Sequence, residues 1–292
     1  MSGPLGTGAV LAPGYTVLEH LSRGRQLDVY DVWSEARDCR CVAKLLRPDV
    51  GEPERERAAA RLEREGALLA RLTHPHLVRA YETLPGPLVI LETLDGETLS
   101  YTIRVRRRRL PANEIAWLGL HLCSAVHYLH GQGLLHLDIK PSNVIDQFGR
   151  ARLIDLSLAR PPGPVPAGVG TAQYLSPEQA AGGEAGPAAD VWGVGATLWA
   201  AATGQRPFAV PDPGEPYEQL TRTAQPVGTL RRLPRALREA IDAALSHAPA
   251  DRPAVRELTT WIEEALPDEP RPLSPENGQP ASGSPLESLG GS

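Results

Sequence analysis

The most specific string in this chain of 292 residues reads His136-Leu137-Asp138-Ile139-Lys140-Pro141-Ser142-Asn143. It follows an apolar stripe at helical spacing that ends at Gly131 and Gly133, so we expect it to be a loop. The loop holds a carboxylate, an ammonium group two residues later and an amide five residues later. Phosphoryl transfer requires a group that orients the attacking hydroxyl, a cation for the transferring phosphoryl group and oxygen ligands for Mg²⁺. The string therefore predicts phosphoryl-transfer chemistry.

A second carboxylate, Asp155, follows at the end of an apolar strand predicted for residues 151–154. Mg²⁺ prefers oxygen ligands, so Asn143 and Asp155 together predict a metal site. Of the 30 lysines and arginines in the chain, only Lys44 and Lys140 are lysine. A position that stays lysine in such a chain is expected to need a compact ammonium rather than a planar guanidinium.

The hydrophobic pattern changes along the chain from strand-like to helical. Short alternating or apolar runs predict strands at residues 15–21, 29–33, 41–46 and 88–92, and residues 54–72 between them have helical spacing. From residue 113 onward the pattern is mainly helical, with further helices expected at residues 191–203, 235–246 and 255–266. These patterns predict an α+β protein with a small β-rich lobe followed by a larger helical lobe.

The chain resembles the eukaryotic-like protein kinase family, in its bacterial branch, from about Tyr15 to Leu266. The resemblance rests on motifs that occur in the family's order and spacing: Cys41-Val42-Ala43-Lys44, His136 to Asn143, Asp155-Leu156-Ser157, Gly170 to Glu178, Asp190-Val191-Trp192 and Asp251-Arg252-Pro253. It implies a bilobal protein-kinase-like fold, with one main helix in the N-lobe and a mostly helical C-lobe. The boundaries expected from it are a flexible N-terminus at residues 1–13, the N-lobe at 14–94, the C-lobe at 95–266 and a disordered Pro/Ser/Gly-rich tail at 267–292.

The resemblance also implies a role for each polar residue of these motifs. Asp138 would orient the acceptor hydroxyl and Lys140 would stabilise the transferring group. Lys44 would hold the α- and β-phosphates of ATP and pair with Glu65, for which Glu63 is a close competitor on the same predicted helix. The expected metal ligands for Mg²⁺ or Mn²⁺ are Asn143 and Asp155. Arg252 is expected to pair with Glu178.

The nucleotide pocket implied by the resemblance combines apolar side chains with backbone groups of the segment that joins the lobes. The residues expected to contact the nucleotide are Gly24, Val29, Val42, Lys44, Glu92, Leu94 and Ile145. In that pocket the carbonyl of Glu92 and the amide of Leu94 would meet adenine, with Val29 and Val42 above the base and Ile145 below it.

Two stretches depart from the family's pattern. The glycine-rich loop aligns with residues 22–29 and retains only Gly24, which is expected to weaken phosphate binding unless Arg23 and Arg25 compensate by charge. Leu137 replaces the arginine that usually receives an activation-loop phosphate, and residues 158–170 contain no serine, threonine or tyrosine. These two absences predict activity that is not controlled by activation-loop phosphorylation.

The sequence leaves more than one function open. The reading that we favour is a serine/threonine protein kinase that transfers the γ-phosphoryl group of ATP to protein hydroxyls. A pseudokinase that acts as a nucleotide-binding scaffold or interaction module is the alternative, because the glycine-rich loop is degraded. A small-molecule kinase of related fold is a second alternative, although residues 170–178 resemble a platform for a peptide substrate.

Composition limits the partners and the location that we expect. A net charge of −5 argues against nucleic acid as a partner, and the chain has neither a secretory signal nor an apolar run long enough to span a membrane. A cytoplasmic location is therefore expected. The strongest charge run predicts either a solvated helix face or a docking patch for an acidic partner, and consists of Arg104, Arg106, Arg107, Arg108 and Arg109.

Overall fold

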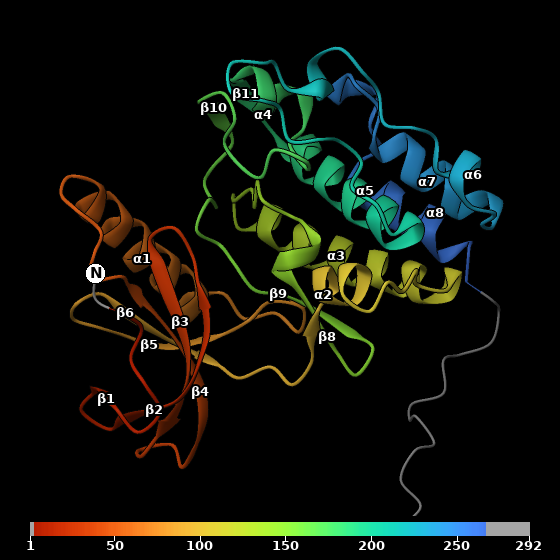
Figure 1. Cartoon of the computed structure of the whole chain (residues 1–292). Coiled ribbons are helices and arrows are strands. Elements are labelled where there is room, and N and C mark those ends of the chain that lie inside the picture. The colour runs from red at the N-terminus through yellow and green to blue at the C-terminus, as the bar shows by residue number, and fades with distance from the viewer. Residues whose placement is uncertain (1–2, 267–292) are drawn as a thin grey trace, which may run out of the picture.

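The computed structural model describes residues 3–266 and has two lobes, shown in Figure 1. The N-lobe is built on a six-stranded antiparallel sheet with the strand order β1-β2-β3-β4-β6-β5. Its strands are β1 (Val10–Ala12), β2 (Tyr15–Arg23), β3 (Leu27–Ser34), β4 (Cys39–Leu46), β5 (Ala80–Leu84) and β6 (Leu88–Glu92). The four strands predicted from the sequence are confirmed, whereas β1 and β5 were not expected.

Strand β1 lies within residues 1–13, for which the sequence predicted a flexible N-terminus. Val10 pairs with Thr16 and Ala12 with Tyr15, so the segment extends the sheet at the edge beside β2. Composition did not indicate this strand because it is only three residues long and Val10 is largely exposed. The predicted tail at 267–292 lies outside the described residues.

Helix α1 (Glu54–Arg71) is the main helix of the N-lobe and packs against β5 and β6. Leu62 and Leu69 are buried on the face that meets the sheet. Gly66 lies on the same face, where an added Cβ would stand 2.3 Å from the hydroxyl of Thr83. Glycine at this position therefore lets the helix approach the sheet closely enough to bring its buried polar side chain, Glu65, toward β4.

The C-lobe is a bundle of helices around one almost completely buried member, α5 (Pro187–Thr203). The helices packed against it include α3 (Ala112–Gly131) and α7 (Arg235–Ala244), while α8 (Val255–Glu263) covers α3. Close packing depends on small residues, because a Cβ on Gly195 would stand 2.7 Å from the Cβ of Ala244. Shorter helices complete the lobe: α2 (Leu99–Arg104), α4 (Pro177–Ala181) and α6 (Val227–Leu230).

Two small sheets place the loops that lie between the lobes. Strands β7 (Glu97–Thr98), β8 (Val144–Gln147) and β9 (Arg150–Leu153) form one sheet, in which β8 and β9 carry the chain from Asn143 to Asp155. Leu153 donates its N–H to the carbonyl of His76 at 2.9 Å and accepts from the N–H of Val78 at 2.9 Å, which ties this sheet to the chain after α1. Strands β10 (Gly163–Val165) and β11 (Gly183–Ala185) form the other. No helix within residues 3–266 is long and apolar enough to cross a membrane.

A largely buried ion pair joins α4 to the segment before α8. Arg252 donates to both carboxylate oxygens of Glu178 at 2.7 and 2.8 Å, which confirms the predicted pairing. The same guanidinium donates to three backbone carbonyls and lies 5.0 Å from the ring centroid of Trp192. All donors of the arginine are therefore engaged in a site without free solvent.

Loss of this arginine is expected to destabilise the fold strongly. Arg252→Ala leaves Glu178 without a cation in a largely buried site, so the free energy of unfolding should fall by about 3–5 kcal/mol. Arg252→Lys should recover little, because one ammonium group cannot reproduce the bidentate contact and the carbonyl contacts. The measurement is urea unfolding at constant m value.

The exposed pair of Arg235 with Glu239 serves as the control for that experiment. Arg235→Ala should change the free energy of unfolding by less than about 0.5 kcal/mol. Equal losses in Arg252→Ala and Arg235→Ala would contradict the structural role assigned to the buried pair.

Candidate active site

A buried ion pair joins the sheet of the N-lobe to α1. Lys44 on β4 donates from its Nζ to Oε1 of Glu65 at 2.7 Å, and both side chains are buried. The sequence competitor, Glu63, is exposed on the opposite face of the helix. Burial by itself lowers the pKa of the Lys44 ammonium, but the carboxylates of Glu65 and Asp155 more than reverse this effect, so the pKa is raised. The ammonium group of Lys44 is therefore positively charged at neutral pH.

Asp155 lies just after β9 and interacts electrostatically with the ammonium group of Lys44, which belongs to the N-lobe. Burial raises the pKa of Asp155, but Lys44 and the N–H of Ser157, which donates to its Oδ1 at 2.8 Å, bring the pKa down to about 2. The carboxylate is thus ionised at neutral pH. Asn143 is held next to it, because its backbone carbonyl accepts from the N–H of Ile154 at 3.0 Å.

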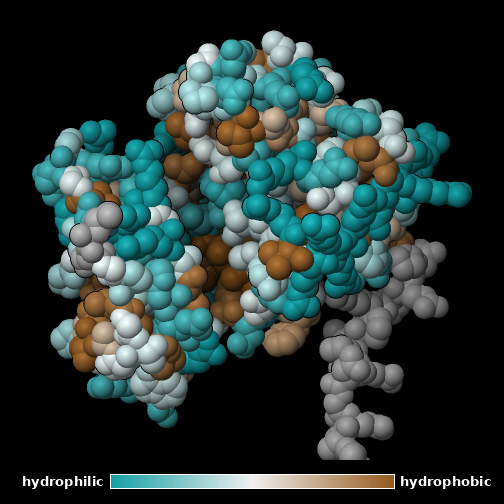
Figure 2. Space-filling model, in the orientation of Figure 1, coloured by the Kyte–Doolittle hydropathy of each residue, from teal (hydrophilic) through white to brown (hydrophobic). Residues whose placement is uncertain are grey.

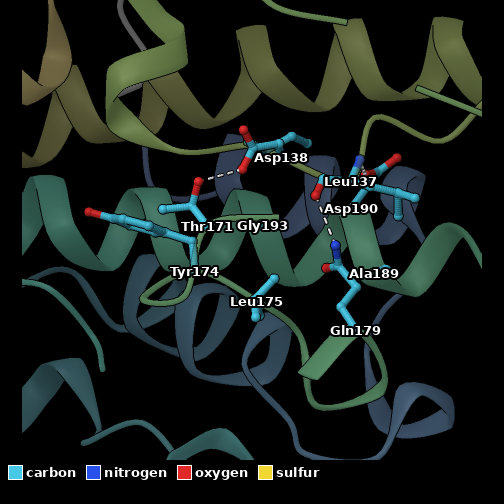
Figure 3. Close-up of a pocket in the computed structure, with 10 residues that line it drawn as sticks. Leu137, Asp138, Thr171, Tyr174, Leu175, Gln179, Ala189, Asp190 and Gly193 are labelled. Carbon is cyan, nitrogen blue, oxygen red and sulfur yellow. Dashed lines mark hydrogen bonds between the residues drawn. The ribbon is translucent and has the colours of Figure 1, made fainter. Parts of the chain in front are cut away.

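A second polar cluster surrounds the carboxylate of Asp138 (Figure 3). Oδ1 accepts from the hydroxyl of Thr171 at 2.7 Å, and Oδ2 accepts from Nζ of Lys140 at 2.5 Å. Lys140 also donates to the Thr171 hydroxyl at 2.5 Å. Asn143 donates from Nδ2 to the carbonyl of Asp138 at 2.9 Å and to its Oδ2 at 3.1 Å. The structure thus brings together Asp138, Lys140 and Asn143 of the loop string and adds Thr171 to them.

The loop before Asp138 has an unusual backbone that Asp190 stabilises. Leu137 has φ +63°, which is rare for a residue other than glycine. Asp190, in the first turn of α5, accepts from the backbone N–H groups of His136 and Leu137, both at 2.8 Å, and contacts Nε2 of His130 at 2.9 Å. A buried carboxylate of the C-lobe core therefore sets the position of the loop.

Two glutamine side chains that the sequence analysis did not single out donate hydrogen bonds to backbone carbonyls near Asp138 and Thr171. Gln179 donates from Nε2 to the carbonyls of Leu137 and Val169, both at 2.8 Å (Figure 3). Gln219 donates to the carbonyl of Ala172 at 2.6 Å. Both glutamines act on backbone groups, which leaves no chemical signature in the sequence. Together they fix the segment that carries Thr171.

Most of the residues expected to line a nucleotide pocket lie on β3, β4, β6 and β8 and in the segment after β6. Figure 2 shows a hollow between the lobes with apolar surface inside it. Val29 lies on β3 and Val42 on the adjacent strand β4. In the register of these two strands, Val29 is opposite Lys44. Ile145 lies on β8, and Gly96 approaches that strand so closely that a Cβ would stand 3.1 Å from Cγ2 of Ile145. Glu92 is the last residue of β6, and Leu94 lies in the segment between β6 and β7, where it is half-buried.

The degraded glycine-rich loop forms a tight turn between β2 and β3. The N–H of Gly24 donates to the carbonyl of Leu27 at 2.8 Å. Arg23 makes two hydrogen bonds to buried Asp28, at 2.8 and 2.9 Å, so its charge is already neutralised. Arg25 lies 3.4 Å from Glu54 and is almost fully exposed. Compensation by Arg23 is therefore not supported, because its guanidinium is directed to Asp28.

The chemistry available at this site follows from its charges. A carboxylate at Asp138 accepts a hydrogen bond from a hydroxyl, and an ammonium at Lys140 is close enough to stabilise negative charge that develops beside it. Asp155 is ionised, and Asn143 uses its amide nitrogen toward Asp138, which leaves its amide oxygen as a ligand atom. An ionised carboxylate next to an amide oxygen fits a divalent cation of the Mg²⁺ type.

Comparison with known proteins agrees with this arrangement. The family described as protein kinase domain matches residues 15–261. The crystal structure of a point mutant of the PknI kinase domain of Mycobacterium tuberculosis superimposes with a TM-score of 0.70 at 25% identity, covering 90% of this chain and 99% of that one.

Curated relatives are bacterial proteins named as serine/threonine-protein kinases. PknK of Mycobacterium tuberculosis is 32% identical over 258 residues, which cover 84% of this chain and 23% of PknK. A probable serine/threonine-protein kinase of Streptomyces coelicolor is 32% identical over 209 residues, which cover 66% of this chain and 30% of that protein. This chain thus matches less than a third of the length of these relatives.

A double-mutant cycle tests the buried pair of Lys44 and Glu65. Lys44→Met should lower the free energy of unfolding by about 3 kcal/mol, because it leaves Glu65 buried without a cation. Adding Glu65→Gln should then cost less than Glu65→Gln costs in the unmutated chain, with a coupling energy of about 1–3 kcal/mol. Chemical unfolding of the three variants measures these values.

Glu63→Gln provides the matched control, since Glu63 is exposed on the same helix. Its coupling to Lys44→Met should be close to zero. A coupling of Lys44 to Glu63 as large as that to Glu65 would show that the helix is rotated from the position described above.

Proposed function

Because this chain belongs to the protein kinase family, we propose that it transfers the γ-phosphoryl group of ATP to serine and threonine hydroxyls of proteins. Members of the family use ATP together with a divalent metal ion. The observation that carries the proposal is the cluster in which Asp138 contacts both Lys140 and Thr171. Its placement beside an ionised Asp155 and a buried Lys44 supplies the charges that this reaction needs.

Each side chain has a distinct part in the proposed reaction. Asp138 accepts a hydrogen bond from the substrate hydroxyl and takes its proton as the new O–P bond forms and the bond to the leaving diphosphate breaks. Lys140 stabilises the negative charge on the phosphoryl oxygens during transfer. Lys44, held by Glu65, positions the α- and β-phosphates of ATP.

The metal site and the base pocket complete the proposal. Asn143 and Asp155 would hold Mg²⁺, for which Mn²⁺ is a substitute, and the bound ion would neutralise phosphate charge. Gly24, Val29, Val42 and Ile145 would enclose the nucleotide, with Glu92 and Leu94 presenting backbone groups to adenine. We also propose residues 14–94 as the nucleotide-binding lobe and 95–266 as the lobe that holds the protein substrate.

The serine/threonine preference is supported by Lys140 and Thr171. Both side chains contact the carboxylate of Asp138, so the acceptor hydroxyl has to approach this carboxylate next to two polar side chains. The named relatives are serine/threonine-protein kinases, which supports the same preference.

Asp138→Asn separates catalysis from nucleotide binding. The variant should lose phosphoryl transfer by about 10²–10⁴-fold, because the amide cannot take the hydroxyl proton, while ATP affinity should change little since Asp138 does not hold the nucleotide. Transfer is measured with radiolabelled ATP on a generic protein substrate and affinity by calorimetry.

The same assays decide between an enzyme and a binding module. The alternative, a pseudokinase scaffold, is favoured by the neutralised Arg23 and the loss of two loop glycines. Unmutated protein that binds ATP but transfers no phosphate with Mg²⁺ or Mn²⁺ would support the scaffold. Protein that neither binds ATP nor transfers phosphate would contradict the proposed enzyme altogether.

We further propose that activity is not controlled by phosphorylation of the activation loop. Leu137 is buried in an apolar cluster with Leu135, Val165, Ala185 and Ala189. Leu135 and Arg160 exchange backbone hydrogen bonds at 2.8 and 3.1 Å, and β10 pairs with β11 over three residues. Apolar packing and backbone pairing thus order a segment that phosphate–arginine contacts order in other members of the family.

Phosphatase-treated protein should therefore keep its initial rate on an exogenous substrate. Thr171→Ala should lower that rate about tenfold even in the phosphatase-treated protein, because it removes the hydroxyl that bridges Asp138 and Lys140, and Thr171→Ser should restore most of it. Initial rates by radiolabel incorporation measure both effects. A lag that ATP preincubation abolishes, with stoichiometric phosphate on Ser157 or Thr171, would contradict this account.

A further inference from the structure

A cavity of about 190 Å³ lies beside the Asp138 cluster. It is large enough for about six water molecules at roughly 30 Å³ each, and so for a carboxylate or phosphate side chain. Its walls come from the end of α2, the loop after Lys140, the segment after Thr171 and the loop after α5. The lining side chains that matter here are Ile103, Arg104, Pro141, Tyr174, Gln205 and Arg206.

Two residues that line the cavity, Pro141 and Tyr174, connect it to the cluster around Asp138. Pro141 follows Lys140, whose ammonium contacts Asp138. Tyr174 lines this cavity and also the small pocket that contains Asp138 and Thr171. Figure 3 shows its ring beside Thr171, with the phenol oxygen directed away from Asp138. A chain that places a hydroxyl at Asp138 is therefore within reach of this cavity with its neighbouring side chains.

The cavity carries positive charge that the described residues do not neutralise. Arg104 and Arg206 line it, no aspartate or glutamate does, and neither guanidinium forms an ion pair with a carboxylate among residues 3–266. Both act on the same phenol: burial raises the pKa of Tyr174 to about 12, and Arg206 and Arg104 both oppose that rise. Two cations that converge on one half-enclosed space repel each other, and an anion placed between them would relieve the repulsion.

The rest of the arginine run behaves differently. Arg106 pairs with Glu97, and Arg108 donates to Glu114 at 2.8 Å, so both charges are neutralised within the chain. Arg109 lies near the same loop as Arg206, since its Cγ is 3.5 Å from where a Cβ on Gly204 would stand. Arg107 and Arg109 are exposed and form no ion pair among the described residues, and Arg104 is the member of the run that lines the cavity.

We propose that Arg104 and Arg206 select protein substrates that carry an anionic side chain close to the phosphorylated hydroxyl. The inference rests on the proposed function, since it assigns a substrate class to that same site. The anion is a carboxylate or a phosphate group, which share the charge and the oxygen acceptors that a guanidinium binds. In a chain with a net charge of −5 the attraction is local, so it acts on substrate selection more than on long-range steering.

A positional-scanning peptide library tests the proposal. Each peptide has one serine or threonine acceptor, and aspartate, glutamate, phosphoserine, glutamine or arginine is placed in turn at each position within five residues on either side. At one or two positions an acidic residue should raise kcat/KM by about fivefold to tenfold over glutamine, mainly through a lower KM. Added salt should weaken the preference. A response to phosphoserine alone would assign the anion to a previously phosphorylated substrate.

Charge reversal identifies the residues responsible. In Arg104→Glu and Arg206→Glu the preference at that position should invert, so that arginine peptides exceed aspartate peptides in kcat/KM. Arg71→Glu, an exposed change at the end of α1 in the other lobe, should keep the acidic preference. An acidic preference that persists in both cavity variants, or peptide phosphorylation without any acidic preference in the unmutated protein, would overturn the inference.

A binding assay separates failure of this inference from failure of the proposed function. Fluorescence anisotropy with a labelled acidic peptide and Asp138→Asn protein measures occupancy without turnover. Weaker binding in the additional variants Arg104→Glu and Arg206→Glu would support the cavity even if the unmutated chain phosphorylates no peptide. Binding that ignores both arginines would overturn it whether or not the chain is active.

Discussion

The position of the active loop depends on one carboxylate, that of Asp190. It accepts the backbone N–H groups of His136 and Leu137 at 2.8 Å each, and it stands on α5, the most buried helix of the C-lobe. Charge-assisted bonds of this kind contribute about 1.5–3 kcal/mol each, enough to offset the cost of a left-handed φ at a leucine. Because Asp138 follows immediately, the packed core positions its backbone, while Lys140, Asn143 and Thr171 hold its carboxylate.

Electrostatic contact between the lobes runs through Lys44. Its ammonium is held by Glu65 and lowers the pKa of Asp155, which belongs to the segment after β9. Removing any one of these charges leaves the others buried and only partly compensated, so the three act as a unit. The unit also links α1 to the segment that contains Asp155, and Arg64 of α1 adds a hydrogen bond to the carbonyl of Ser157 at 3.2 Å. Movement of α1 would therefore alter the ionic state of the site.

The segment after Asp155 is packed by apolar side chains, whereas the cavity next to Asp138 is lined by two arginines without ionic partners among the described residues. Leu137 and Val165 bury the segment that follows Asp155 in an apolar cluster, so this region needs no added charge to be ordered. Arg104 and Arg206 instead remain without ionic partners among the described residues and line a cavity next to Asp138. Positive charge without an ionic partner among the described residues therefore lies at the end of α2 and in the loop after α5, beside Asp138.

From the sequence alone we could predict the two lobes, the main helices, most of the N-lobe strands and every polar side chain of the Asp138 loop, because these depend on local periodicity and on short motifs. Short strands such as β1 and β10 escaped prediction, since three residues carry too little pattern. The choice of Glu65 over Glu63 was decided by the close approach of α1 at Gly66. The neutralisation of Arg23 by Asp28 and the convergence of Arg104 with Arg206, 102 positions apart in the chain, were decided by tertiary structure alone. Charge at one residue is a property of the sequence, whereas its compensation depends on which distant side chains the fold brings within a few ångströms.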